Sequence, residues 1–199
     1  MKREHIEWCD IQIWHAEIED LHPRVLCIGD SITINYFYEV NSGLTDKAYC
    51  ARIATSRFLA DPIFHKEISL GLAQYQFDII HFNNGLHGWD YSEEVYDQHF
   101  DSFIETLQQH AGHARLIWAS TTPVRNKQQL AEFDEKTARV QARNAIARQH
   151  IQRYQIPEND LYNVVADHPE YYSNDGVHMN GDGNSALARQ VVSCISQFI

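Results

Sequence analysis

The chain has 199 residues, of which 44% are hydrophobic and 22% are charged, so it is long enough for one folded domain with a sizeable core. This composition excludes a disordered or collagen-like protein. The formal net charge of -11 argues against a nucleic-acid or membrane partner, since both need a clustered positive face. No stretch approaches the ~20 apolar residues of a membrane helix and no signal peptide is visible, so we expect a cytoplasmic protein.

Apolar runs bounded by turn residues alternate with segments of helical spacing along the chain. We expect strands at residues 24–28, 49–53, 78–82 and 115–119, with a weaker fifth at 161–165, and helices at 63–75, 92–110, 130–154 and 185–198. This alternation predicts a doubly wound α/β arrangement, in which helices cover both faces of a parallel sheet. We assign residues 1–22 to a packed N-terminal extension and residues 1–199 to a single domain.

Candidate catalytic residues stand after the expected strands, where the ligand site of an open α/β sheet forms. Gly29-Asp30-Ser31 follows the first strand, and Asp175-Gly176-Val177-His178 precedes the last helix. A serine becomes a nucleophile when a base takes its proton and a third group orients that base. Ser31 and His178 supply the first two groups, and Asp175 is close enough in sequence to orient the imidazole. Taken alone, Asp30 or Ser31 could simply cap the following helix.

Together, and in this order, the two motifs resemble those of the SGNH hydrolase superfamily, also called GDSL esterases and lipases. The resemblance runs from about Pro23 to the C-terminal helix. It implies a three-layer, flavodoxin-like fold with a five-stranded parallel sheet, and a serine esterase that needs no metal or organic cofactor. The resemblance makes Ser31 the nucleophile, His178 the general base and Asp175 the residue that orients the base.

The family's middle motifs are altered in this sequence. The third motif is usually Gly-x-Asn-Asp, whose Asn donates to the oxyanion, but after Gly85 the position of that Asn holds His87. Either His87 donates instead, or Asn83 or Asn84 reaches the oxyanion, and we favour the two Asn because a carboxamide donor needs no particular tautomer. A further interpretation is that Asn83 and Asn84 only form hydrogen bonds with the backbone of the turn. The second motif lacks its glycine, and the amide of Ser56 is the candidate donor there.

Cysteine and histidine positions give no sign of a metal site. The four cysteines are Cys9, Cys27, Cys50 and Cys194; no two form a C-x-x-C pair, so we expect free thiols. Four other histidines are His81, His99, His110 and His113. They share no spacing with Asp or Glu that suggests metal ligation, and we expect them at the surface.

Arginines and aromatic residues receive mostly structural interpretations. Arg139, Arg143, Arg148 and Arg153 are expected on the solvated face of one helix. Trp8, Trp14 and Trp118 are expected as core or interface anchors. Trp89 is a candidate for stacking on the substrate, because it lies beside His87 after the third strand. Asp30 is a further candidate near the substrate, and Tyr36 could line the cleft or simply pack.

The predicted reaction is ester hydrolysis through an acyl-serine intermediate. An acidic chain without an amphipathic membrane helix makes long-chain phospholipid a poor substrate, so we expect a short acyl group, such as acetyl, on a carbohydrate or other small polyol. Thioesterase or lysophospholipase activity is the alternative among enzymes. The non-enzymatic alternative is a carbohydrate-binding pseudoenzyme, in which the altered third motif has removed catalysis. The sequence makes no prediction of the oligomeric state.

Overall fold

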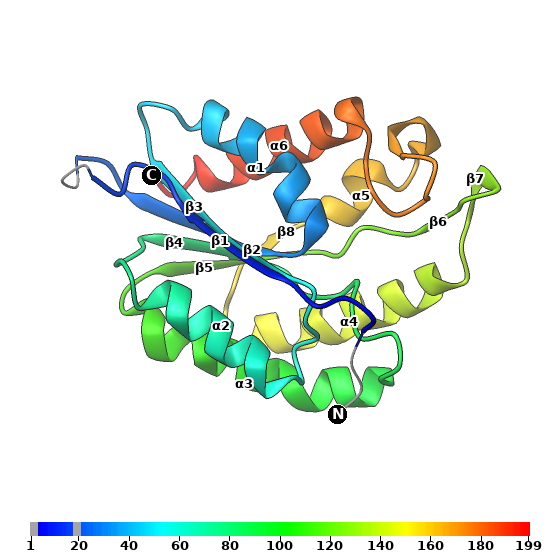
Figure 1. Cartoon of the computed structure of the whole chain (residues 1–199), viewed down its shortest axis with the longest axis horizontal. Helices are drawn as coiled ribbons and strands as arrows, with labels where there is room; N and C mark the ends of the chain where they lie inside the picture. Colours follow the sequence, from blue (N-terminus) through cyan, green and yellow to red (C-terminus); the bar gives the residue numbers. More distant parts are fainter. Residues whose placement is uncertain (1–3, 18–20) are drawn as a thin grey trace.

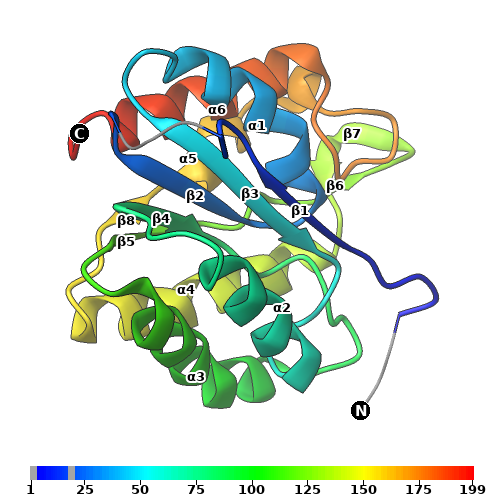
Figure 2. The same cartoon turned by 60° about the vertical axis from the view of Figure 1, so that its left-hand side comes forward.

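A six-stranded sheet forms the centre of the computed structural model, which describes residues 4–17 and 21–199 (Figure 1). Its strands, in spatial order, are β1 (Cys9–Ile13), β3 (Tyr49–Thr55), β2 (Arg24–Gly29), β4 (Ile79–Phe82), β5 (Arg115–Ala119) and β8 (Glu158–Asn159). The last five strands of this order run parallel, and β1 pairs antiparallel with β3 at the edge (Figure 2). The predicted five-stranded parallel sheet is therefore present, with one antiparallel strand added.

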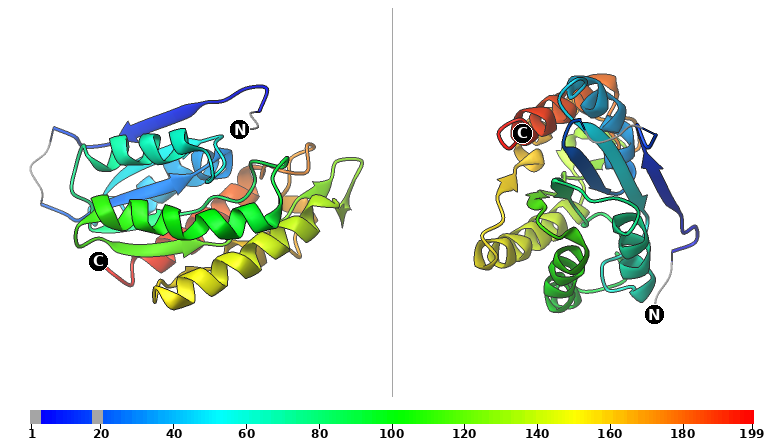
Figure 3. Two further views of the ribbon diagram at one scale, coloured as in Figure 1. Left: turned by 90° about the horizontal axis from the view of Figure 1, so that it is seen from below. Right: turned by 90° about the vertical axis from the view of Figure 1, so that its left-hand side faces the viewer.

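Helices cover both faces of this sheet (Figure 3). One face carries α1 (Ser31–Gly43), α5 (Leu161–Val165) and α6 (Gly181–Ile195), and the other carries α2 (Pro62–Leu72), α3 (Glu93–Ala111) and α4 (Lys136–Arg153). The resulting three-layer α/β fold is the one predicted from the sequence.

Burial on both faces explains why the central strands could be predicted. Every residue of β2 is buried. Val25 and Cys27 belong to the core beneath α1 and α6, whereas Leu26 and Ile28 belong to the core beneath α2, α3 and α4. Each buried Leu, Ile or Val contributes ~1.5–3 kcal/mol. A strand that packs against helices on both sides therefore has a continuous apolar sequence, without the alternation of a half-exposed strand.

The weak fifth strand predicted at residues 161–165 is wrong. These residues form α5, and the strand at this edge is the short β8 just before it. The carboxylate of Asp160 accepts a hydrogen bond from the amide of Asn163 at 3.2 Å, and Ser120 Oγ accepts one from the amide of Tyr162 at 2.8 Å. These two acceptors bond amides of the first turn that have no partner within the helix. The stabilisation of the helix outweighs the strand propensity of Val164 and Val165.

Two further segments differ from the prediction. The helix predicted at 130–154 starts later than residue 130, because β7 (Gln129–Phe133) pairs with β6 (Arg125–Asn126) in a separate two-stranded sheet. Part of the N-terminal extension predicted at 1–22 is the edge strand β1, while residues 1–3 and 18–20 lie outside the described residues.

His81 does not lie at the surface as predicted. It belongs to β4, which is covered on both faces, and its side chain is fully buried. The Nδ2 amide of Asn159 lies 3.0 Å from His81 Nε2. Burial disfavours the charged imidazolium and lowers the pKa of His81 to about 4. His110 and His113 are exposed, in agreement with the prediction, and His99 is half-buried.

Candidate active site

Ser31 lies in the tight turn between β2 and α1, at the carboxyl end of β2. Gly29 ends the strand where a side chain cannot fit, because a Cβ atom there would lie 2.1 Å from Thr33 Oγ1. Asp30 caps the helix, and its Oδ1 accepts a 2.9 Å hydrogen bond from the amide of Ile32. The amide of Ser31, at the first position of α1, has no acceptor within the helix. The turn thus presents both a hydroxyl and an amide at the end of the sheet.

Asp175 and His178 lie on the loop between η1 (Pro169–Tyr171) and α6. The amide of Ser173 closes this loop with a 2.8 Å bond to the carbonyl of His178. Gly176 has a φ of +73°, and a Cβ atom there would lie 2.1 Å from the carbonyl oxygen of Arg125. Because β6 passes so close, only glycine fits at position 176, directly after Asp175.

A continuous chain of hydrogen bonds joins Asp175, His178 and Ser31. Asp175 Oδ2 lies 2.6 Å from His178 Nδ1, and His178 Nε2 lies 2.8 Å from Ser31 Oγ. Asp175 Oδ1 also accepts 2.9 Å bonds from the amides of Val177 and His178. Burial acts to raise the pKa of Asp175, but these hydrogen bonds outweigh burial and hold that pKa below its usual range. An ionised Asp175 holds the Nδ1 proton, which directs the Nε2 lone pair of His178 toward the serine hydroxyl.

Ser31 and His178 open onto one large cavity. Its volume is about 460 Å³, and its other lining side chains include Leu86, Trp89 and Val177. This volume lies within the range of small-molecule sites, roughly 300–1,000 Å³. A small substrate can therefore reach the serine.

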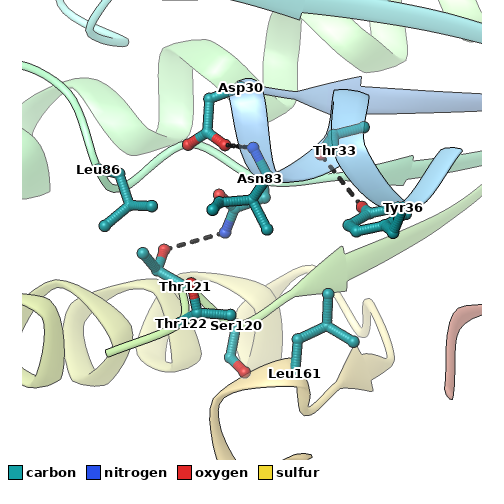
Figure 4. A pocket seen from close by; sticks show the side chains of 10 residues that line it. Asp30, Thr33, Tyr36, Asn83, Leu86, Ser120, Thr121, Thr122 and Leu161 are labelled. Carbon is teal, nitrogen blue, oxygen red and sulfur yellow. Dashed lines mark hydrogen bonds between the residues drawn. The ribbon is translucent and has the colours of Figure 1, made fainter. Parts of the chain in front are cut away.

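A second cavity, beside the first turn of α1, has a volume of only about 10 Å³ (Figure 4). Asp30, Tyr36 and Asn83 are among its lining residues. Tyr36 is buried, and its hydroxyl lies 3.1 Å from Thr33 Oγ1. The cavity is too small for an acyl group, so Tyr36 packs in the core and Asp30 acts here as the cap of α1.

The two asparagines after β4 are engaged with the protein itself. Asn83 Nδ2 donates to the carbonyl of Ala119 at 2.7 Å and lies 2.9 Å from Thr121 Oγ1. Asn84 Nδ2 donates to the carbonyl of Arg57 at 2.8 Å. Neither residue lines the large cavity. The favoured oxyanion donors therefore do not line the cavity onto which Ser31 opens, and both carboxamides fix the backbone of the loop.

Ser56 is also held away from the large cavity. Its amide donates to the carbonyl of Trp8 at 3.1 Å, and its hydroxyl accepts a 2.9 Å bond from the amide of Trp8. These bonds continue the pairing of β1 with β3, a strand pair that was not predicted from the sequence. The amide of Ser56 is thus already used, and the structure does not place it as the second oxyanion donor.

His87, in contrast, lines the large cavity together with Ser31 and His178. Its Nδ1 lies 3.0 Å from both carboxylate oxygens of Glu4. Burial opposes the charged imidazolium, but the hydrogen bond to Glu4 and the negative charges of Asp30 and Glu4 raise the pKa of His87 above its usual value. Burial likewise acts to raise the pKa of Glu4, and the bonds with His87 and the amide of Gly88 bring it below the usual value. The two side chains form an ion pair at the cavity.

Arg143, predicted on a solvated face, is fully buried beneath the loop that carries His87. Its guanidinium donates to the carbonyls of Gly85 at 2.9 Å, His87 at 2.7 Å and Gly88 at 3.1 Å. Arg139, on the same helix, donates to the carbonyl of Trp89 at 2.7 Å. The solvated-face prediction is therefore wrong for Arg143, whereas the Arg139 side chain is 32% exposed. Both arginines hold an irregular loop that has no strand or helix of its own.

The spacing of α4 could have revealed the burial of Arg143. It lies three residues after Val140 and four before Ala147, so it falls on the apolar stripe of the helix. Arg148 and Arg153, off this stripe, are 38% and 59% exposed, which agrees with the prediction. No comparable signal marks Glu4, because its contact with His87 joins residues 83 positions apart.

Trp89 is held by the same arginines and also lines the large cavity. The guanidinium of Arg143 lies 4.8 Å from the centre of its ring, and that of Arg139 lies 5.4 Å away. These cation–π contacts fix the indole at the cavity wall. Trp89 therefore remains a candidate for substrate contact, as the sequence suggested.

Within residues 4–17 and 21–199, no cluster of three or more His, Cys, Asp or Glu side chains has a geometry suited to a metal ion. None of the helices in the same part of the chain combines the length and the apolar character needed to cross a bilayer.

The solved structures that are similar to this chain include the following three. A GDSL-like lipase from Bacteroides thetaiotaomicron has a TM-score of 0.66 and 16% identity, with 89% of each chain covered. Est24, a carbohydrate acetylesterase from Sinorhizobium meliloti, has a TM-score of 0.70 and 11% identity over 89% of this chain and 100% of its own. The C-terminal catalytic domain of peptidoglycan O-acetyltransferase A from Streptococcus pneumoniae has a TM-score of 0.65 and 17% identity over 88% of this chain and 94% of its own.

These likenesses show that the chain has the SGNH hydrolase fold, so the fold expected from the two sequence motifs is confirmed. No family model and no curated protein matches the sequence.

Proposed function

We propose that this protein is a serine ester hydrolase of the SGNH kind. The observation that carries the proposal is the hydrogen-bonded chain from Asp175 through His178 to Ser31, at the edge of a large cavity. The names of the structural neighbours, a lipase and a carbohydrate acetylesterase among them, agree with this chemistry.

In the first half-reaction, Ser31 Oγ attacks the acyl carbon while His178 Nε2 takes the hydroxyl proton. The carbonyl electron pair moves onto oxygen and forms a tetrahedral oxyanion. When this intermediate collapses, the bond from carbon to the alcohol oxygen breaks, and His178 gives its proton to the leaving alcohol. The products of this step are the free alcohol and an acyl-serine.

In the second half-reaction, water takes the place of the alcohol. His178 removes a proton from the water, whose oxygen attacks the acyl carbon of the ester on Ser31. Collapse of the second oxyanion breaks the bond to Ser31 Oγ, and the proton returns from His178 to the serine. Asp175 stays ionised throughout and stabilises the transient imidazolium.

Two groups are suited to hold the oxyanion. The amide of Ser31 lies at the start of α1, where the helix dipole also favours negative charge. His87 is the second, because it lines the cavity while the carboxamides of Asn83 and Asn84 donate elsewhere. Loss of one such donor typically reduces kcat by ~10²-fold or more. We therefore assign to His87 the position that an asparagine holds in the family's third motif.

We propose a short acyl group, such as acetyl, on a carbohydrate or other small polyol as the substrate. The cavity volume of about 460 Å³ suits a small molecule, and Trp89 at its wall offers an aromatic surface to a sugar ring. The names of two neighbours, a carbohydrate acetylesterase and a peptidoglycan O-acetyltransferase, concern acetyl groups on carbohydrates.

The test is hydrolysis of p-nitrophenyl acetate and of an acetylated oligosaccharide by the wild-type protein and by Ser31→Ala. We expect turnover of both substrates by the wild type, with at least ~10³-fold less by the variant. Turnover of a long-chain lysophospholipid or an acyl thioester in preference to both acetates would contradict the substrate. Binding of the oligosaccharide without any turnover would identify a carbohydrate-binding pseudoenzyme and contradict the reaction.

A further inference from the structure

Glu4 reaches the active-site cavity from a segment that precedes the first strand. Both of its carboxylate oxygens lie 3.0 Å from His87 Nδ1, and Oε1 also accepts a 3.1 Å bond from the amide of Gly88. Glu4 itself lines the cavity that contains Ser31 and His178. The carboxylate therefore touches the His87 ring and the backbone beside it.

The edge strand β1 fixes the path of this segment. Trp8, just before β1, exchanges hydrogen bonds with Ser56, and its ring meets the His87 ring edge-on at 6.3 Å between centres. Glu7 Oε2 lies 2.9 Å from Arg57 Nη1. The antiparallel strand thus carries Glu4 across the carboxyl end of β3 to the loop after β4, and the contact with His87 is anchored on both sides.

The contact decides where His87 can hold a proton. An ionised carboxylate only accepts hydrogen bonds, so Nδ1 must carry its proton to bond Glu4. A neutral His87 in this geometry then has an unprotonated Nε2, which cannot donate to an oxyanion. Only the imidazolium carries a proton on both nitrogens. In this geometry, His87 can therefore donate to the oxyanion only as the imidazolium.

We propose that Glu4 is a positioning residue that keeps His87 in its doubly protonated form, so that Nε2–H is available to the oxyanion formed at Ser31. This inference rests on the proposed function, in which Ser31 is the nucleophile and His87 an oxyanion donor. Glu4 acts through His87 and exchanges no proton with the substrate.

Other charged or titratable groups around His87 come from several parts of the chain. Asp30, the cap of α1, favours the imidazolium, and Arg143 of α4 opposes it. His178 lines the same cavity from the loop before α6 and must be neutral to act as a base. His5 and Asp90 also line this cavity. The active form therefore combines a neutral His178 with a charged His87. Each imidazole has a carboxylate at Nδ1, Asp175 for His178 and Glu4 for His87, and at His87 the negative charge of Asp30 adds to that of Glu4.

A pH profile of kcat tests this assignment. We expect the wild-type rate to rise with pH as His178 loses its proton, and to fall at higher pH as His87 loses its own. Glu4→Gln keeps a hydrogen-bond acceptor for Nδ1 and removes only the charge. It should move the falling limb to lower pH by about one unit and reduce the maximal kcat by roughly tenfold, with little change in KM. Glu17→Gln, an exposed residue of the N-terminal region, is the matched control and should leave the profile unchanged.

Two additional variants separate positioning from a general effect on the fold. In a His87→Ala background, Glu4→Gln should have no further effect on kcat, because Glu4 acts through the missing ring. His87→Asn supplies an uncharged donor, so it should retain more activity than His87→Ala and lose the falling limb.

An unchanged falling limb in Glu4→Gln, or equal losses from Glu4→Gln with and without His87, would overturn the role of Glu4. Either result could occur with Ser31 still essential, so it would leave the proposed function standing. Full activity of Ser31→Ala would instead remove the basis of both proposals.

Discussion

The guanidinium of Arg143 donates a 2.7 Å hydrogen bond to the backbone carbonyl of His87, which lies 56 residues earlier in the chain. The same buried side chain binds the carbonyls of Gly85 and Gly88. One charged group on α4 therefore satisfies three carbonyls of the loop after β4. This relationship fixes the backbone of the candidate oxyanion donor.

Arg143→Ala should destabilise the protein and disorder this loop. The change leaves buried carbonyls without donors, and a loss of about 3 kcal/mol in the free energy of unfolding is expected. Arg143→Lys keeps a charge but lacks the planar fork that reaches several carbonyls, so it should recover only part of the loss. Urea unfolding measures both variants. Arg153→Ala, on the exposed end of the helix, serves as control and should change stability by less than about 0.5 kcal/mol.

His178→Ala should reduce kcat by roughly 10³-fold or more, because it removes the base for both half-reactions. Asp175→Ala should be milder, since the imidazole remains and loses only its orientation and the stabilisation of its charged form. Steady-state kinetics with p-nitrophenyl acetate, corrected for the buffer rate, ranks the two variants. A larger loss from Asp175→Ala than from His178→Ala would contradict the assigned roles.

Gly176→Ala should impair catalysis through the loop that carries Asp175 and His178. Its φ of +73° disfavours alanine, and the added methyl group would lie 2.1 Å from the carbonyl oxygen of Arg125. We expect at least a tenfold loss in kcat together with a lower melting temperature. Gly181→Ala is the matched control, because a Cβ atom there meets nothing within 4 Å. Similar behaviour of the two variants would show that the loop tolerates displacement.

The buried His81 predicts a loss of stability in mild acid. The unfolded chain binds a proton at His81 below about pH 6.5, whereas the folded state does so only near pH 4. The free energy of unfolding should therefore decrease as the pH falls through this window, by up to about 3 kcal/mol from this group. His81→Gln cannot take up that proton, so the difference between its stability at pH 7.5 and at pH 5 should be smaller. An equal difference in both proteins would show that other groups account for the acid sensitivity.

The features that depend on local spacing could be predicted from the sequence alone. Ser31 follows an apolar strand directly, and Asp175 lies three residues before His178, so both parts of the candidate triad can be read from short segments. The central strands are continuous apolar runs because helices cover both their faces. These patterns do not require knowledge of distant contacts.

The parts that could not be predicted depend on long-range pairing. Glu4 meets His87 only because β1 adds to the sheet edge, and β1 is too mixed in composition to be recognised as a strand from its sequence. The same pairing uses the amide of Ser56, which the motif positions alone leave available. Arg143 is charged, and its burial is possible because the carbonyls of the loop after β4 accept its hydrogen bonds. These partners are distant in sequence, so their contact with Arg143 could not be predicted.

Covalent trapping at Ser31 tests the central claim most directly. A fluorophosphonate probe reacts with a serine only where a base activates it, and the mass of the labelled peptide identifies the residue. The account predicts one adduct, on Ser31, with labelling abolished in Ser31→Ala and strongly slowed in His178→Ala. An adduct on a different serine, or no adduct in a protein that still hydrolyses acetate esters, would contradict the assignment of Ser31 as the nucleophile.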